Sequence, residues 1–245
     1  MSKDYQKEFD KFLTKIKNKE NFAFSRFSDG ELFVMKNQKV VLGPGFFITG
    51  DRVGQNIYTK EEQKEFIPAK HQFYREKLIE AFQYKSPDYF KGICTKTDVG
   101  QKEFEWQLDL HGDDNLDNLT FANLLINSNY SRYIEEVVPL FSDREVIYVV
   151  NELANLEGLP FKVKKDFRVG SNCMVNNYDI IEEINKYISE NQIKNHLILC
   201  SAASLSNMII HQCYSKNKEN TFLDIGSSLN PYLSKSPYGE QVDEW

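Results

Sequence analysis

Two acidic residues separated by a single glycine, Asp29-Gly30-Glu31, form the sharpest chemical pattern in this sequence. They follow a short apolar run, and the glycine allows a sharp turn that can aim both carboxylates at one point. Paired carboxylates suit a hard divalent cation, Mn²⁺ or Mg²⁺, which in turn can neutralise a diphosphate. Arg26 lies just upstream and can donate a fork of hydrogen bonds to phosphate. An alternative stays open, in which Ser28 or Asp29 caps a helix and Glu31 lies in its first turn.

Small residues and hydroxyls fill a second segment, from Ser201 to Ser204. It lies between a strongly apolar run at 195–200 and a helical pattern at 203–214. The free N–H groups at the start of a helix can bind phosphate, and small side chains permit close approach. The glycines of a dinucleotide-binding or P-loop motif are absent. A plain strand-to-helix turn with a serine cap explains the segment equally well.

Two further acidic residues follow apolar runs. Asp224 ends the run at 221–225 and is followed by Gly226 and Ser227, while Glu152 follows the run at 145–150. Asp224 can orient a sugar hydroxyl, or assist metal or base chemistry. Its alternative role is to hold the next turn through local hydrogen bonds. A general base must lie within hydrogen-bond reach of the hydroxyl it activates, so the sequence nominates Glu152 and Asp224 as catalytic candidates without choosing between them.

Short apolar runs that alternate with helical patterns must position these side chains. This alternation predicts an α/β fold with a largely parallel sheet flanked by helices, in a single Rossmann-like domain over residues 1–245. In such a fold, ligands bind outside the carboxyl ends of the strands. We expect strands near 22–24, 90–95, 145–150, 161–169, 195–200 and 221–225, and helices near 3–19, 60–84, 104–108, 119–141, 180–188 and 203–214. We expect loops at 43–54 and 111–118, where an acceptor could be recognised.

Composition excludes several classes of protein. The chain has 245 residues, a net charge of −6 and 41% hydrophobic residues, which argues against disorder and against sequence-independent nucleic-acid binding. No apolar run approaches the roughly 18 residues of a membrane span. The charged N-terminus lacks the apolar core of a secretion signal, so we expect a cytoplasmic protein. The four cysteines have no CxxC spacing, and a zinc site is not expected.

Three segments, in order, resemble the D-type glycosyltransferases, a family first known as a bacterial domain of unknown function. The stretch from Ser25 to Leu32 (SRFSDGEL) resembles the family's opening "SRFGDGE". The segment 130–152, in which a helix is followed by a strand and a glutamate, resembles its middle part. The segments 197–204 (LILCSAAS) and 222–226 (FLDIG), preceded by 172–181 (NCMVNNYDII), resemble its closing "GPTA" and "DIGH" patterns. The match spans residues 20–233, and it departs from the pattern at Ser28, Ser201-Ala202-Ala203 and Ser227.

The resemblance implies a Rossmann-like fold and transfer of a hexose from a nucleotide sugar, typically UDP-linked. It implies that Asp29 and Glu31 bind the divalent cation, and that Arg26 contacts the donor. Asp224 and Gly226 match the closing motif, and Glu152 matches the glutamate after the central strand. Ser201, Ser204 and Ser227 join Arg26 and Gly226 as candidate donor-binding residues.

The working hypothesis is therefore a metal-dependent glycosyltransferase that uses a nucleotide-sugar donor and a glycan or glycoprotein acceptor. Two alternatives stay open. One is a Rossmann-like transferase or hydrolase of another class, although a methyltransferase would need a glycine-rich turn after its first strand. The other is a non-catalytic partner in a glycan-assembly complex, which the altered motif positions favour. A homo-oligomer is compatible with either.

Overall fold

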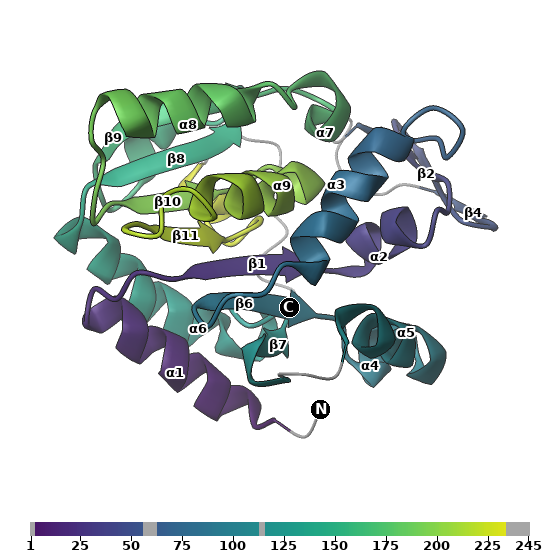
Figure 1. The fold of residues 1–245 in the computed structure, drawn as a ribbon, viewed down its shortest axis with the longest axis horizontal. Coiled ribbons are helices and arrows are strands. Elements are labelled where there is room, and N and C mark those ends of the chain that lie inside the picture. Colours follow the sequence, from purple (N-terminus) through teal and green to yellow (C-terminus); the bar gives the residue numbers. More distant parts are fainter. Residues whose placement is uncertain (1–2, 56–62, 113–115, 234–245) are drawn as a thin grey trace.

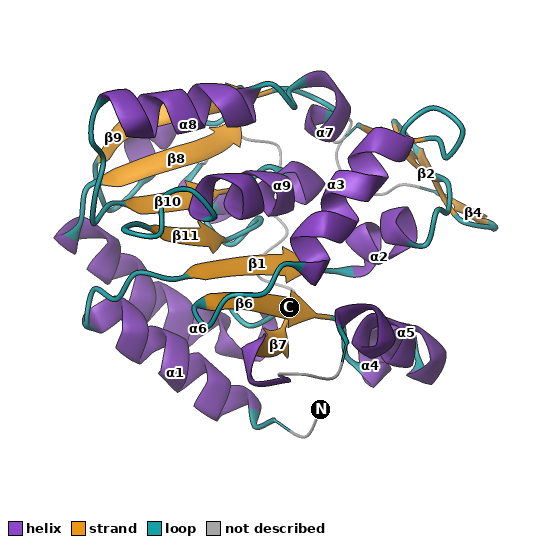
Figure 2. Cartoon of the chain, in the orientation of Figure 1, coloured by secondary structure: helices purple, strands orange, loops and turns teal. Residues whose placement is uncertain are grey.

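A seven-stranded sheet, parallel throughout, forms the centre of the computed structural model, which describes residues 3–55, 63–112 and 116–233 (Figures 1 and 2). The order is β7-β6-β1-β11-β10-β8-β9. This confirms the α/β class and the largely parallel sheet. The strands are β1 (Ala23–Phe27), β6 (Tyr89–Ile93), β7 (Leu119–Phe121), β8 (Val146–Asn151), β9 (Val163–Val169), β10 (Leu197–Cys200) and β11 (Thr221–Asp224).

Helices cover both faces of this sheet, which is why its strands are apolar on both sides. Alternate residues enter opposite cores: Ala23 and Phe27 pack on one face, and Phe22 and Phe24 on the other. The first face is covered by α3 (Gln72–Gln83), α5 (Gln101–His111), α8 (Ile180–Glu190) and α9 (Ala203–Tyr214). The second is covered by α1 (Tyr5–Lys17) and by α6 (Tyr130–Arg132) with the adjoining helical turns Tyr133–Val137 and Val138–Asp143.

A second, antiparallel sheet of four strands stands beside the carboxyl edge of the first, next to α2 (Asp29–Met35) (Figure 1). The expectation of a loop at 43–54 is wrong, because short aromatic and β-branched strands alternate there with glycine turns. Gly45 and Gly50 have φ values of 80° and 60°, which glycine adopts without strain. The strands, in order β4-β3-β2-β5, are β2 (Val40–Gly43), β3 (Phe46–Thr49), β4 (Arg52–Gly54) and β5 (Lys64–Phe66).

Three other expectations need correction. The expected helix at 60–84 lies partly outside the described residues; its next part is strand β5, and α3 begins only at Gln72, after Pro68. The expected helices at 119–141 begin instead with edge strand β7. The expected loop at 111–118 lies partly outside the described residues; His111 ends α5 with 3% of its surface exposed, and Leu116–Asn118 is a short 3₁₀ helix. Short α4 (Lys96–Val99) and α7 (Cys173–Asn176) follow β6 and β9.

Within the described residues, no helix has the length and apolar character needed to cross a bilayer.

Candidate functional site

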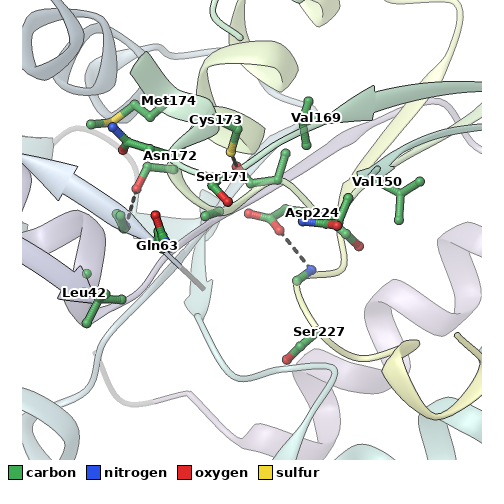
Figure 3. Close-up of a pocket in the computed structure, with 18 of the residues that line it drawn as sticks. Leu42, Gln63, Val150, Val169, Ser171, Asn172, Cys173, Met174, Asp224 and Ser227 are labelled. Carbon is green, nitrogen blue, oxygen red and sulfur yellow. Dashed lines mark hydrogen bonds between the residues drawn. The ribbon is translucent and has the colours of Figure 1, made fainter. Parts of the chain in front are cut away.

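A cavity of about 450 Å³ opens at the carboxyl ends of the parallel strands. Figure 3 shows Asp224 and Val150, from two of these strands, across the cavity from Leu42 and Gln63 of the antiparallel-sheet region. The site therefore lies between the two sheets, where doubly wound folds bind their ligands. Its polar and charged lining comprises Arg26, Ser28, Asp29, Glu31, Gln63, Lys64, Asn151, Ser171, Asn172, Ser201, Ser204, Asp224, Ser227 and Asn230.

Neighbouring strands β1 and β11 bring Arg26 and Asp224 together. The Asp224 carboxylate accepts hydrogen bonds from the Arg26 N–H (3.2 Å) and the Gly226 N–H (3.1 Å). The Arg26 Nε donates to the Ala122 carbonyl (2.6 Å), which leaves the outer nitrogens of the guanidinium directed past Gly226. Gly226 has φ of 50°, and a side chain there would collide with that guanidinium. Because Gly226 has no side chain, the Arg26 guanidinium has room to lie beside it in the cavity.

The two buried carboxylates of the cavity have opposite pKa shifts. Burial raises the pKa of Asp224 to about 7, although Arg26 and the two N–H donors oppose the rise and Glu31 adds to it. Burial also acts to raise the pKa of Glu31, but Lys64, Ser204 and Ser28 together hold it below its usual value. Two carboxyl groups whose pKa values are shifted in opposite directions can take different acid–base roles. Glu31 stays ionised, and Asp224 can exchange a proton near neutral pH.

Neighbouring groups of the protein contact both carboxylate oxygens of Glu31. Its Oε2 accepts hydrogen bonds from the Ser28 N–H (3.1 Å) and Ser28 Oγ (2.9 Å), which makes it part of the capping box of α2. Its Oε1 accepts from Ser204 Oγ (2.6 Å) and lies 3.5 Å from Lys64 Nζ. The helix-cap alternative from the sequence is therefore present, while Asp29 is exposed and lines the cavity.

Lys64 is a site residue that the sequence did not single out. It lies on β5, where it is paired with Leu42, and its ammonium donates to Ser204 Oγ (2.8 Å). Its side chain is only 13% exposed. No motif surrounds Lys64, and its segment was expected to be helical. Only the antiparallel sheet, which carries β5 across the carboxyl edge of the main sheet, reveals its position.

The turn between β10 and α9, residues 201–204, lines the cavity. The N-cap residue, Ala202, has no capping side chain of its own, and a serine one turn along, Ser206, accepts the Ala202 N–H through its Oγ (2.9 Å). Ala203 has a φ of 45°, a left-handed conformation that costs about 1–2 kcal/mol in a non-glycine residue. Ser201 is held by a 2.9 Å hydrogen bond with the Tyr148 hydroxyl. The Ser201 N–H donates to the Val149 carbonyl (2.8 Å), so the N–H groups of Ala203 and Ser204, in the first turn of this twelve-residue helix, are the ones suited to an anion.

Eight of the nine residues nominated from the sequence line this one cavity. Glu152 does not: it is exposed beyond β8, and its Oε1 lies near Gly170, 3.1 Å from where a β-carbon on that glycine would stand. The residues that do line it are Arg26, Asp29, Glu31, Ser201, Ser204, Asp224, Gly226 and Ser227. Their roles stay predictions.

The protein's own donors surround one of the two carboxylates that the sequence predicted to bind a cation. A carboxylate offers about four lone-pair positions. All four positions on Glu31 face donors from Ser28, Ser204 and Lys64, one of them a cation. Among the described residues, no three His, Cys, Asp or Glu side chains are grouped so as to hold a metal ion. Asp29 is exposed, with one oxygen accepting from the Gly30 N–H (2.9 Å), and binding of Mn²⁺ or Mg²⁺ stays a prediction.

Comparison with known proteins bears on the fold of this chain. No family model matches the sequence, and no curated protein does. Two solved structures are similar. One is a selenomethionine-substituted structure of domain of unknown function 1792, with a TM-score of 0.56. The other is described as showing that this highly conserved domain has a distinct glycosyltransferase fold, with a TM-score of 0.55. Each is 15% identical and covers 94% of this chain and 82% of its own. The chain therefore has this glycosyltransferase fold, the one that the resemblance in the sequence implied.

Proposed function

We propose that this protein transfers a hexose from a nucleoside-diphosphate sugar, with UDP as the nucleotide, to a hydroxyl group of a glycan or glycoconjugate. The observation that carries the proposal is the cavity at the carboxyl edge of a glycosyltransferase fold, which Arg26, Lys64, the start of α9 and Asp224 line together. Cations and uncapped N–H groups suit a diphosphate, and a carboxylate suits sugar hydroxyls. A binding module for neutral glycans would not need the cations.

The chemistry assigned to the site is a displacement at the anomeric carbon. The acceptor hydroxyl forms the new bond, and the bond to the diphosphate oxygen breaks. Arg26 and the N–H groups at the start of α9 stabilise the charge that builds on the leaving diphosphate, which is the usual role of preorganised donors. Asp224, with a pKa of about 7, accepts a hydrogen bond or a proton from a sugar or acceptor hydroxyl.

A divalent cation, if the donor brings one, would supply charge neutralisation on the diphosphate, and Asp29 is the open carboxylate near it. Mg²⁺ commonly binds through one carboxylate and the substrate phosphates, which is compatible with this arrangement. No step above depends on the cation. Metal dependence is a separate question from the transfer itself.

The test is consumption of nucleotide sugars. UDP-hexoses are incubated with the protein, with and without Mn²⁺ and with simple sugar acceptors, and UDP release is followed by ³¹P NMR. We expect UDP release by the native protein and a loss of at least about 100-fold in Asp224→Ala, because removal of a positioned acid–base group costs about 10²–10⁴. Lys36→Met is the control, since Lys36 pairs with Glu103 and does not line the cavity. No release of UDP, together with thermal stabilisation by S-adenosylmethionine, would replace this proposal with the methyltransferase alternative.

A further inference from the structure

On the basis of the proposed function, we infer that Lys64 is the protein's own cation for the donor diphosphate and that Glu31 positions Lys64 rather than binding a metal. The starting observation is the short chain of contacts from Lys64 Nζ to Ser204 Oγ (2.8 Å) and from Ser204 Oγ to Glu31 Oε1 (2.6 Å). Lys64 and Glu31 are also in direct contact at 3.5 Å. Three elements, β5, α9 and α2, thus meet at one ammonium group.

Contacts hold the Lys64 ammonium in place without using all of its hydrogen-bond donors. An ammonium group has three donors. Two of them are directed at Ser204 and Glu31, and the Lys64 side chain also lines the cavity. The remaining donor can therefore serve a ligand. Because the side chain is 13% exposed, little rotamer freedom is left to lose when an anion binds.

The glutamate has no lone pair to offer a metal. Both oxygens of Glu31 accept two donors each, as described above, and the side chain is 8% exposed. A metal ion bound at Oε1 would need to displace Ser204 or Lys64, and would lie beside a like charge. In the arrangement seen, the ammonium of Lys64 occupies the position next to Glu31 that the sequence assigned to the metal.

Two neighbouring features complete the anion site. Gly30 is close to the same ammonium, since a β-carbon there would lie 3.2 Å from Lys64 Nζ, so Gly30 leaves room for the lysine. Ser204 lies in the first turn of α9, and residues 201–204 at the start of this helix line the same cavity. A diphosphate at this point would meet Lys64 on one side and the start of α9 on the other.

Glu31→Gln separates the two roles of the glutamate. Glutamine at this position of a capping box can still accept the Ser28 N–H, so α2 keeps its cap. The variant removes the negative charge that faces Lys64 and places an amide N–H₂ donor where Oε1 accepted from Ser204 and Lys64. Lys64→Met removes the cation and keeps an apolar stem of similar length. Lys36→Met is the matched control, a lysine-to-methionine change outside the cavity.

The experiment is calorimetric titration of UDP into each variant, once in EDTA and once in Mn²⁺, with thermal unfolding to confirm that each variant is folded. We expect UDP to bind the native protein in EDTA, Lys64→Met to weaken binding about 10- to 100-fold, and Glu31→Gln to weaken it by a similar factor with and without Mn²⁺. Lys36→Met should leave the affinity unchanged. The inference is overturned if Lys64→Met binds UDP normally, or if Glu31→Gln loses affinity only in Mn²⁺. Failure of the native protein to bind UDP under either condition would instead refute the proposed function.

Discussion

Gly226 connects backbone conformation to the chemistry of the site. It has a left-handed φ, and a β-carbon there would strike the Arg26 guanidinium, whereas Gly45 has a left-handed φ with nothing within 4 Å. We expect Gly45→Ala and Gly226→Ala each to lower the free energy of unfolding by about 1–2 kcal/mol from backbone strain alone. Only Gly226→Ala should also weaken UDP binding, because it displaces Arg26. Urea unfolding and UDP titration of both variants measure these effects, and equal UDP affinities would contradict the role given to Gly226.

Asp224 makes stability depend on pH near neutrality. Its pKa is about 7 in the fold, against 3.8 ordinarily, and Arg26 and Glu31 are the charged groups that face it. The folded protein therefore holds this proton longer than the unfolded chain does. The resulting stabilisation is complete below pH 3.8 and is lost as the pH rises through 7, by roughly 1.4 kcal/mol for each unit of pKa shift.

We expect Asp224→Asn to flatten this pH dependence. The amide also places an N–H₂ group near the Arg26 and Gly226 donors, and that cost is independent of pH. The difference in unfolding free energy between the native protein and the variant should fall steadily from pH 4 to pH 7. Urea unfolding followed by circular dichroism at several pH values measures it. Identical pH slopes for the two proteins would show that Asp224 has an ordinary pKa.

Among the elements, α2 depends on its cap. It has only seven residues, and Ser28 and Glu31 cap each other's backbone N–H groups at its start. Ser28→Ala should lower the free energy of unfolding by about 1 kcal/mol. Thr95→Ala, in the matching capping box of α4, is a control away from the cavity. If Ser28→Ala leaves both stability and UDP affinity at native values, the cap does not hold Glu31 in place.

The elements also show which signals a sequence carries. Apolar runs such as those at 145–150 and 195–200 predict β8 and β10 well, because strands buried on both faces have continuous apolar residues. The sequence pattern did not predict the antiparallel sheet, because its strands are short and partly exposed and glycines lie between them. Lys64 lies on β5 of this sheet, so the sequence pattern did not indicate it as a site residue. Arg26, Asp224 and Gly226 follow apolar runs and were found. Glu152 also follows one, yet it is exposed and is not among the residues that line the cavity.

At the scale of the whole molecule, the buried parallel sheet forms one side of the site and the smaller antiparallel sheet forms the other. The strands β1, β10 and β11 are buried on both faces, whereas no residue of β3 or β4 is fully buried and Val53 is 74% exposed. We expect the backbone amides of the central strands to exchange with deuterium far more slowly than those of β3 and β4, since buried cores open only by extensive unfolding. Saturating UDP should slow exchange in β5. Equal protection of both sheets would contradict this division.

The most direct test is a crystal structure of the protein soaked with UDP. We expect the diphosphate within hydrogen-bond distance of the Arg26 guanidinium, Lys64 Nζ and the N–H groups at the start of α9, inside the cavity at the carboxyl edge of the parallel sheet. Asp224 should remain clear of the phosphates and face the space where the hexose would lie. Nucleotide bound elsewhere on the molecule, with this cavity empty at saturating UDP, would contradict the assignment of the cavity as the donor site.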